Sequence, residues 1–181
     1  MSIEQQSQLM TWFNEPPEWS HNDDEIVIKA GGKTDFWQKT HYGFIRDNGH
    51  FYFQTIQGDF TITAKFKGEY KDQFDQAGVM VRLDEANWVK AGIEFVDGIQ
   101  QISTVVTRDY SDWSVIPSPE PIQSIWIRSK RQGSAFEVFY SLNNKDYIMT
   151  RTFYLTEVDK LEVGLMCAAP EGNGFTVTFE S

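Results

Sequence analysis

Four side chains able to hold a polar ligand are separated by even numbers of positions, namely Arg82, Trp88, Lys90 and Glu94. Side chains alternate between the two faces of a strand, so the last three share one face of a predicted strand over 88–96. Charged groups bond sugar hydroxyls, and an indole ring stacks on the apolar face of a sugar ring. The pattern predicts either a ligand groove or an ordinary solvated network of charges.

Glu94 is the candidate catalytic residue if the protein acts on glycosides. The cations Lys90 and Arg82 favour an ionised carboxylate there, which suits a base or a nucleophile. Glycosidases ordinarily use two carboxylates about 5 to 10 Å apart. Asp109 and Asp112 belong near the far end of the strand, about 20 Å from Glu94. Because no second carboxylate is evident, we expect binding rather than catalysis.

The faces follow from a hairpin predicted at Asp97-Gly98, a dipeptide typical of two-residue turns between strands. This turn places Glu94 opposite Gln101 and Lys90 opposite Val105. A slip of one residue would bury both charges in the core, so this parity is strongly favoured.

A preceding strand over 77–83 joins the hairpin if its loop runs over 84–88. Arg82 then lies opposite Lys90, and like charges directly opposed destabilise a sheet. Either Glu94 or a bound anion must offset them, which leaves room for an anionic sugar as ligand.

Most other segments also alternate with period two and are separated by turn signals such as Gly31-Gly32. With no helix-length periodic segment, the pattern predicts an all-β, two-sheet antiparallel jelly-roll sandwich. We expect a single domain over 1–181, with residues 1–11 as a loose N-terminal arm and a helical turn only near 5–10 or 156–160. The further candidate strands are 25–30, 50–57, 59–67, 99–107, 122–130, 134–141, 147–153, 161–168 and 175–179.

Composition narrows the class of partner. The formal net charge is −10 with no run of Lys or Arg, which argues against nucleic acid and anionic membranes as partners. No segment resembles a transmembrane span or a secretory signal. Cys167 is the only cysteine and lies in the apolar run VGLMCAAP, which predicts a buried thiol and no intrachain disulfide. We expect a cytoplasmic protein that needs no cofactor.

No metal site is expected. The three histidines lack the spacing of metal ligands and fall in predicted loops. Oxygen ligands for a structural calcium are concentrated in two acidic loops without an ordered ligand motif, so this possibility stays open. The acidic residues concerned are Asp72, Asp75, Asp84 and Glu85.

Several motifs, in this order, resemble the regulation-of-enolase protein family over about Trp12 to Phe179. The family is also described as a domain of unknown function, and it supplies no agreed catalytic residues. Its name reflects a proposed role in controlling a glycolytic enzyme, and the resemblance implies a concanavalin A-like lectin/glucanase jelly roll. The motifs are Asp35-Phe36-Trp37, Tyr42-Gly43, Asp75-Gln76-Ala77-Gly78, the WVKAGIE run from Trp88 to Glu94, Val105-Val106-Thr107, Ser111-Asp112-Trp113-Ser114 and Gly174-Phe175.

In a jelly roll of this type one sheet is concave, and sugars bind in that hollow or on its rim. The resemblance implies that the polar face described above is the concave one. Gly78 and Gly92 on this face mark close approach by a ligand or by another backbone, and a strand over 122–130 would add Trp126 and Arg128 to the same wall. The predicted ligand-binding set is Arg82, Trp88, Lys90, Glu94, Gln101, Trp113, Trp126 and Arg128.

We therefore expect a domain that binds a carbohydrate or sugar-like metabolite, without established catalysis. One alternative is a protein-interaction or regulatory module acting on a metabolic enzyme, and another is a glycoside-active enzyme that uses Glu94. The residues leave the oligomeric state open.

Overall fold

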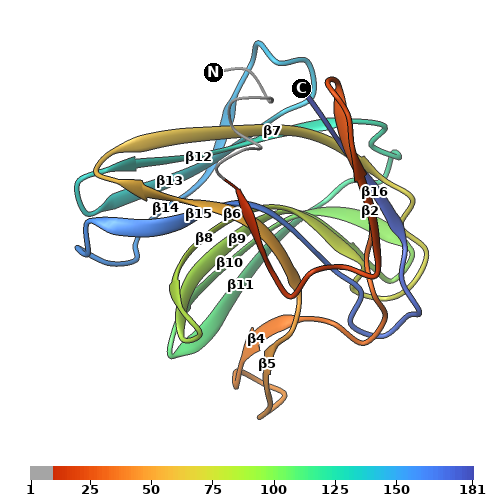
Figure 1. Cartoon of the computed structure of the whole chain (residues 1–181), viewed down its shortest axis with the longest axis horizontal. Coiled ribbons are helices and arrows are strands. Elements are labelled where there is room, and N and C mark those ends of the chain that lie inside the picture. Colours follow the sequence, from red (N-terminus) through yellow and green to blue (C-terminus); the bar gives the residue numbers. More distant parts are fainter. Residues whose placement is uncertain (1–9) are drawn as a thin grey trace.

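The computed structural model describes residues 10–181, and within them it is all-β (Figure 1). Two seven-stranded antiparallel sheets face each other, which confirms the predicted jelly-roll sandwich. Sheet A has the order β1-β6-β15-β8-β9-β10-β11 and sheet B the order β14-β13-β12-β7-β16-β3-β2, while β4 and β5 pair separately. The strands are β1 (Thr11–Phe13), β2 (Glu18–His21), β3 (Glu25–Lys29), β4 (Phe36–Gln38), β5 (Ile45–Asp47), β6 (His50–Gln57), β7 (Phe60–Gly68), β8 (Gln76–Asp84), β9 (Asn87–Val96), β10 (Ile99–Arg108), β11 (Tyr110–Pro117), β12 (Ile125–Gln132), β13 (Ala135–Ser141), β14 (Ile148–Tyr154), β15 (Lys160–Ala168) and β16 (Thr176–Glu180).

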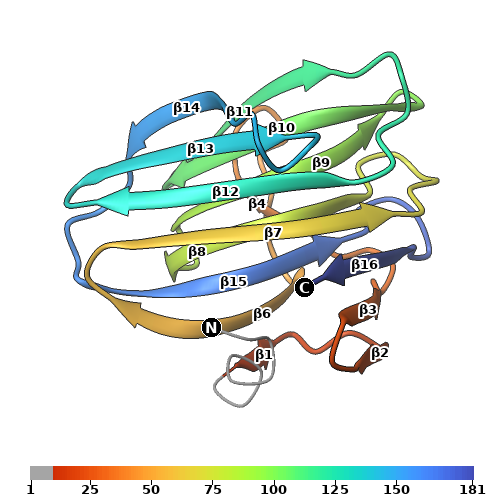
Figure 2. The ribbon, with the colours of Figure 1, turned by 90° about the horizontal axis from the view of Figure 1, so that it is seen from above.

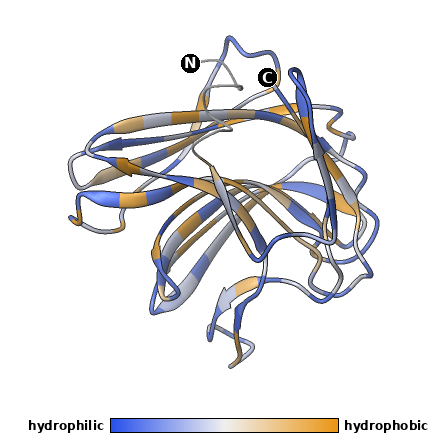
Figure 3. Ribbon diagram, in the orientation of Figure 1, coloured by the Kyte–Doolittle hydropathy of each residue, from blue (hydrophilic) through white to orange (hydrophobic). Residues whose placement is uncertain are grey.

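The main core lies between the two sheets, because each strand turns its apolar side chains inward. Figure 3 shows hydrophobic and hydrophilic residues alternating along the strands, and Figure 2 shows β13, β12 and β7 lying over the strands of sheet A. Burying such faces against each other is the main stabilising contribution in a sandwich. Sheet A supplies Ala77, Val79, Ala91, Ile93 and Ile102 to this core, and sheet B supplies Ile26, Ile28, Phe66, Ile125, Ile127, Val177 and Phe179.

The β9–β10 hairpin has the predicted register. Glu94 pairs with Gln101 and Lys90 with Val105. The turn residue Asp97 has φ 52° and Gly98 has φ 77°, and two positive φ angles are what a type I′ turn requires.

The predicted pairing of the preceding strand is wrong by two residues. Met80, not Arg82, lies opposite Lys90, and Arg82 lies opposite Trp88. The connection is shorter than expected because the Asp84 side chain closes a tight turn, its Oδ1 accepting the Ala86 amide at 2.9 Å. A shift of two residues keeps every side chain on its predicted face, but the opposition of two cations does not exist.

The outer face of sheet A, turned away from sheet B, is covered by residues 31–49, here called the cover segment. Figure 1 shows its strands β4 and β5 beneath sheet A. Phe36 and Trp37 of this segment pack on Trp88, and all three are buried. The central strands of sheet A are therefore buried on both faces. The second core consists of Phe36, Trp37, Phe51, Met80, Trp88, Val105 and Met166.

Three smaller expectations have different outcomes. Cys167 is fully buried, as predicted, and burial raises the pKa of its thiol far above the ordinary range. Residues 156–160 do not form a helical turn. The expected N-terminal arm and the helical turn at 5–10 lie outside the described residues except at their ends, where Met10 is described and Thr11 begins β1.

Candidate functional site

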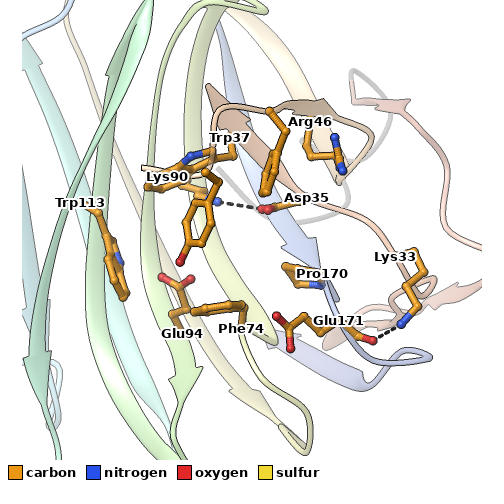
Figure 4. Close-up of a pocket in the computed structure, with 12 residues that line it drawn as sticks. Lys33, Asp35, Trp37, Arg46, Phe74, Lys90, Glu94, Trp113, Pro170 and Glu171 are labelled. Atoms are coloured by element: carbon orange, nitrogen blue, oxygen red, sulfur yellow. Dashed lines mark hydrogen bonds and ion pairs between the residues drawn. The ribbon is translucent and has the colours of Figure 1, made fainter. Parts of the chain in front are cut away.

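A cavity of about 230 Å³ lies between the cover segment and the outer face of sheet A. Its walls come from five parts of the chain, and Figure 4 shows the carboxylates of Glu94 and Glu171 pointing into it. The lining combines five aromatic rings, three carboxylates and three cations. The residues are Lys33, Asp35, Trp37, Tyr42, Phe44, Arg46, Phe74, Lys90, Glu94, Trp113, Pro170 and Glu171.

Glu94 forms the base of this cavity and is only 8% exposed. Its Oε2 accepts a hydrogen bond from Ser103 Oγ at 2.9 Å. Trp113 Nε1 donates to the same Ser103 oxygen at 3.0 Å and also favours the ionised carboxylate. An ionised carboxylate offers about four acceptor positions, so part of its capacity is left for a ligand.

The pKa of the Glu94 carboxyl is shifted in the direction opposite to the prediction. Burial raises the pKa of its carboxyl, and Asp35 adds to the increase. Lys90 and the bonds from Ser103 and Trp113 oppose this rise without cancelling it. The expectation that nearby cations dominate this pKa is wrong: Lys90 favours the ionised form, as predicted, but loss of hydration outweighs it.

Lys90 is at the cavity wall, but its ammonium is already occupied. It donates to the Phe36 carbonyl oxygen at 2.7 Å and to Gln76 Oε1 at 2.5 Å. It also pairs with Asp35 Oδ1 at 3.4 Å (Figure 4). Since an ammonium has three donors, Lys90 mainly fixes β4 onto sheet A.

Arg82 does not line the cavity. Its guanidinium forms a bidentate pair with Asp47 of β5, at 2.6 and 3.0 Å, and stacks over the Phe13 ring at 4.6 Å. Its side chain is 8% exposed. The prediction that Arg82 contacts a ligand is corrected: it clamps the cover segment to sheet A.

Trp88 and Gln101, two further residues of the predicted ligand-binding set, lie on the predicted face of sheet A but differ in whether a ligand could reach them. Trp88 is fully buried beneath Phe36 and donates to the Glu85 carbonyl at 2.9 Å, so it cannot stack on a ligand. Gln101 lies opposite Glu94, and within the described part of the chain its buried Oε1 has no hydrogen-bond partner.

Trp113 is the predicted aromatic residue that the structure places in the wall. It is 37% exposed and stands at one side of the cavity in Figure 4. A ring held at one edge by its N–H bond and open on a face suits stacking against a flat apolar surface.

Trp126 and Arg128 are on the other sheet, which contradicts their predicted place in the same wall. They belong to β12 of sheet B, where Trp126 lies under Lys65 Nζ at 5.2 Å. Arg128 stacks over the Tyr147 ring at 3.6 Å. Alternation along β12 was correctly identified, but alternation does not say to which sheet a strand belongs.

Asp35 and Glu171 are cavity residues that the sequence analysis did not select, and with Glu94 they bring three carboxylates to one place. Asp35 precedes β4, and its Oδ1 accepts the Phe36 amide at 2.8 Å. The statement that Glu94 has no carboxylate companion is thus incorrect. The motif Asp35-Phe36-Trp37 was the available signal, since it already carried part of the family resemblance.

The two glycines on this face have a structural explanation. Gly78 and Gly92 lie opposite each other. A Cβ on Gly92 would come within 1.9 Å of the Ala77 carbonyl oxygen, and one on Gly78 within 2.0 Å of that of Ala91. Close approach of another backbone, rather than of a ligand, requires glycine at both positions.

The acidic loops considered for calcium show ordinary turn chemistry. Asp75 Oδ2 accepts the amides of Lys71 and Asp72 at 3.0 and 2.9 Å. Between residues 10 and 181, no three His, Cys, Asp or Glu side chains are arranged to hold a metal ion. The same residues contain no helix with the length and apolar character needed to cross a membrane.

Known proteins resemble this chain in fold and, in some cases, in sequence. One is "Regulation of enolase protein 1" of Saccharomyces cerevisiae, 36% identical over 169 residues that cover 93% of this chain and 85% of that protein. The crystal structure of a functionally unknown protein from Saccharomyces cerevisiae superposes with a TM-score of 0.92 at 34% identity, covering 97% of this chain and 95% of that chain.

A more distant likeness concerns the fold alone. The Bacteroides ovatus protein described as xyloglucan PUL GH43B matches with a TM-score of 0.70 at 15% identity, over 95% of this chain and 36% of that chain.

Residues 12–181 match the family described as "Protein of unknown function (DUF1349)". The resemblance predicted from the motifs is confirmed: the chain belongs to this family and is a relative of Regulation of enolase protein 1.

Proposed function

We propose that this protein binds a carbohydrate or sugar-like small molecule in the cavity between the cover segment and sheet A. The observation that carries the proposal is the juxtaposition of Trp113 and the buried Glu94 carboxylate in one wall. The exposed ring face can stack on a sugar ring, and the remaining acceptor positions of Glu94 can accept hydrogen bonds from its hydroxyl groups. A cavity of this volume with a few convergent polar groups has the character of a small-molecule site.

The proposed setting is the cytoplasm. Cys167 is a free and buried thiol, as is usual in proteins of a reducing compartment.

The test is a thermal-shift screen of neutral sugars against the wild type and Trp113→Leu. A ligand that binds only the native state must raise the melting temperature. The matched control is Trp19→Leu, because Trp19 is also 37% exposed but does not line the cavity. We expect a shift in the wild type and the control and its loss in Trp113→Leu. If no sugar at millimolar concentration raises the melting temperature, the proposal is wrong.

A separate assay with glycosides addresses catalysis. Release of reducing sugar from any glycoside, lost in Glu94→Gln, would replace binding by a glycoside-active function. The measurement is worthwhile because Asp35 also lines the cavity, so Glu94 has a second carboxylate in the same wall.

A second candidate is a regulatory module that contacts a metabolic enzyme. The observation in its favour is the 36% identical relative, whose name connects it with the regulation of enolase. Sedimentation of the purified chain with and without enolase tests it, and a complex that survives in Trp113→Leu would place the contact outside the cavity.

A further inference from the structure

The polar groups of the cavity are unequally satisfied. Lys90, the one buried cation in the wall, spends its donors on Phe36, Gln76 and Asp35. Glu94, the buried carboxylate, accepts from Ser103 Oγ, is also favoured in its ionised form by Trp113, and forms no ion pair among residues 10–181. The unmet need inside the cavity is therefore for donors and positive charge, not for acceptors and negative charge.

The two remaining cations in the cavity wall do not supply the buried positive charge and free donors that Lys90 lacks. Lys33 and Arg46 are both exposed, so water screens their charges. Lys33 Nζ donates to the Glu171 carbonyl oxygen (Figure 4), and Arg46 stacks over the Phe44 ring at 4.3 Å. An anionic ligand would meet these groups only at the rim, far from buried partners.

The hydroxyl of Tyr42 senses a field dominated by carboxylates. Burial raises the pKa of Tyr42, and Glu94, Asp35 and Glu171 each raise it further. Tyr42 belongs to the cavity lining together with these three acids. The same field stabilises a cation placed beside the ring.

The apolar part of the wall points to the same charge. Trp37, Tyr42, Phe44, Phe74 and Trp113 all line the cavity, and the faces of aromatic rings attract cations, more strongly where water is excluded. Trp37 and Tyr42 meet edge to face, with ring centroids 5.7 Å apart, and Tyr42 stacks on Phe44 at 5.3 Å. These contacts join Trp37, Tyr42 and Phe44 into one aromatic cluster in the cavity wall.

We propose that the preferred ligand of this cavity is an amino sugar, or a sugar-like amine, whose ammonium group sits beside Glu94 within the aromatic wall. The inference rests on the proposed carbohydrate function and names its ligand class. An amine replaces the anionic sugar anticipated from the sequence, because Arg82 already pairs with Asp47 and Lys90 already donates to Gln76.

The test measures the affinities of four sugars by titration calorimetry at pH 7. They are glucose and three derivatives that each differ from glucose at a single group: glucosamine, N-acetylglucosamine and glucuronate. We expect glucosamine to bind about ten-fold or more tightly than glucose, a difference of about 1.4 kcal/mol. N-acetylglucosamine should lose this advantage, because acetylation removes the charge, and glucuronate should bind no better than glucose. Cyclohexylamine, which carries the ammonium without hydroxyls, reports the contribution of the amine alone.

The matched variants are Glu94→Gln and Glu120→Gln. The first keeps an acceptor for Ser103 Oγ but removes the charge, and it should abolish the preference for glucosamine over glucose. Glu120 is exposed and does not line the cavity, so its variant should bind as the wild type does. A preference that persists in Glu94→Gln overturns the inference.

The outcomes separate this inference from the function on which it rests. If neutral sugars bind and glucosamine gains nothing, or glucuronate binds best, the amine inference is wrong and carbohydrate binding stands. If cyclohexylamine alone binds, in a manner that needs Glu94, the amine site is real and the carbohydrate function is wrong. If none of the five compounds binds, the amine inference is wrong, and the thermal-shift screen of sugars decides the carbohydrate function separately.

Discussion

The buried pair between Arg82 and Asp47 should contribute far more to stability than an exposed pair of similar length. Arg82 is 8% exposed and Asp47 20% exposed in their side chains, and two bonds of 2.6 and 3.0 Å join them. Removing one partner leaves the other charge in a site poor in water, which costs about 3 to 5 kcal/mol when burial is complete.

For Arg82→Met we expect the lower end of that range, about 3 kcal/mol, because Asp47 keeps some contact with water. Methionine keeps an apolar stem of similar length, so the loss reports mainly the guanidinium, which pairs with Asp47 and stacks over the Phe13 ring. For a chain of this size, 1 kcal/mol corresponds to a shift in melting temperature of about 2 to 4 °C, so the expected fall is about 6 to 12 °C.

The assay is urea unfolding of four proteins: wild type, Arg82→Met, Asp47→Leu and the double variant. The double variant should be more stable than the sum of the single effects predicts, by about 2 kcal/mol or more, since neither charge is then left alone. The control is Lys29→Met, which breaks the exposed pair of Lys29 and Glu18 at 3.0 Å and should cost less than about 1 kcal/mol. If Arg82→Met costs no more than Lys29→Met, the reasoning about burial is refuted.

Two further predictions concern the same face of sheet A. Burial raises the folded-state pKa of Glu94 above the ordinary 4.5, so stability should fall by about 1.4 kcal/mol per pH unit above pH 4.5 until the folded-state pKa is passed. Glu94→Gln should therefore stabilise the free protein in urea at pH 7 and have little effect at pH 4, and destabilisation at pH 7 would contradict this sign. Gly92→Ala should destabilise by about 1 to 3 kcal/mol or more, because its Cβ meets the Ala77 oxygen, whereas Gly31→Ala, with no contact closer than 3.4 Å, serves as the tolerant control.

Local sequence pattern was sufficient for the β9–β10 hairpin and for the faces of β8. Alternation and the Asp97-Gly98 turn determine which residues face the core, and an error of one residue would have exposed the apolar set. The pairing of β8 with β9 was missed by two residues because alternation is insensitive to even shifts. The register of β8 against β9 is set by the short turn that the Asp84 side chain closes.

The cover segment could not have been placed from local pattern. Its contact with Lys90 joins residues 55 positions apart in the chain, and β4 and β5 are each three residues long, too short to show a period. The assignment of Trp126 to the wrong wall has a related cause, since sheet membership depends on distant pairing. These long-range contacts also explain why Lys90 and Arg82, read as ligand groups, turned out to be structural.

The double role of the cover segment has a consequence for the energetics of binding. Its residues roof the cavity, and they are held to sheet A by Phe36 and Trp37 in the second core and by polar bonds, from Asp47 to Arg82, from the Phe36 carbonyl to Lys90 and from the Gln38 amide to Ser111 at 2.9 Å. Because β4 and β5 belong to neither large sheet, the segment can open without breaking a ladder of the sandwich, so its amides should exchange with solvent at a lower free energy than those of β9. Every such opening subtracts from the population able to bind, and the apparent affinity falls in proportion. Substitutions that never touch a ligand, at Asp47 for instance, are therefore coupled to its affinity through the fraction of molecules in which the roof is closed.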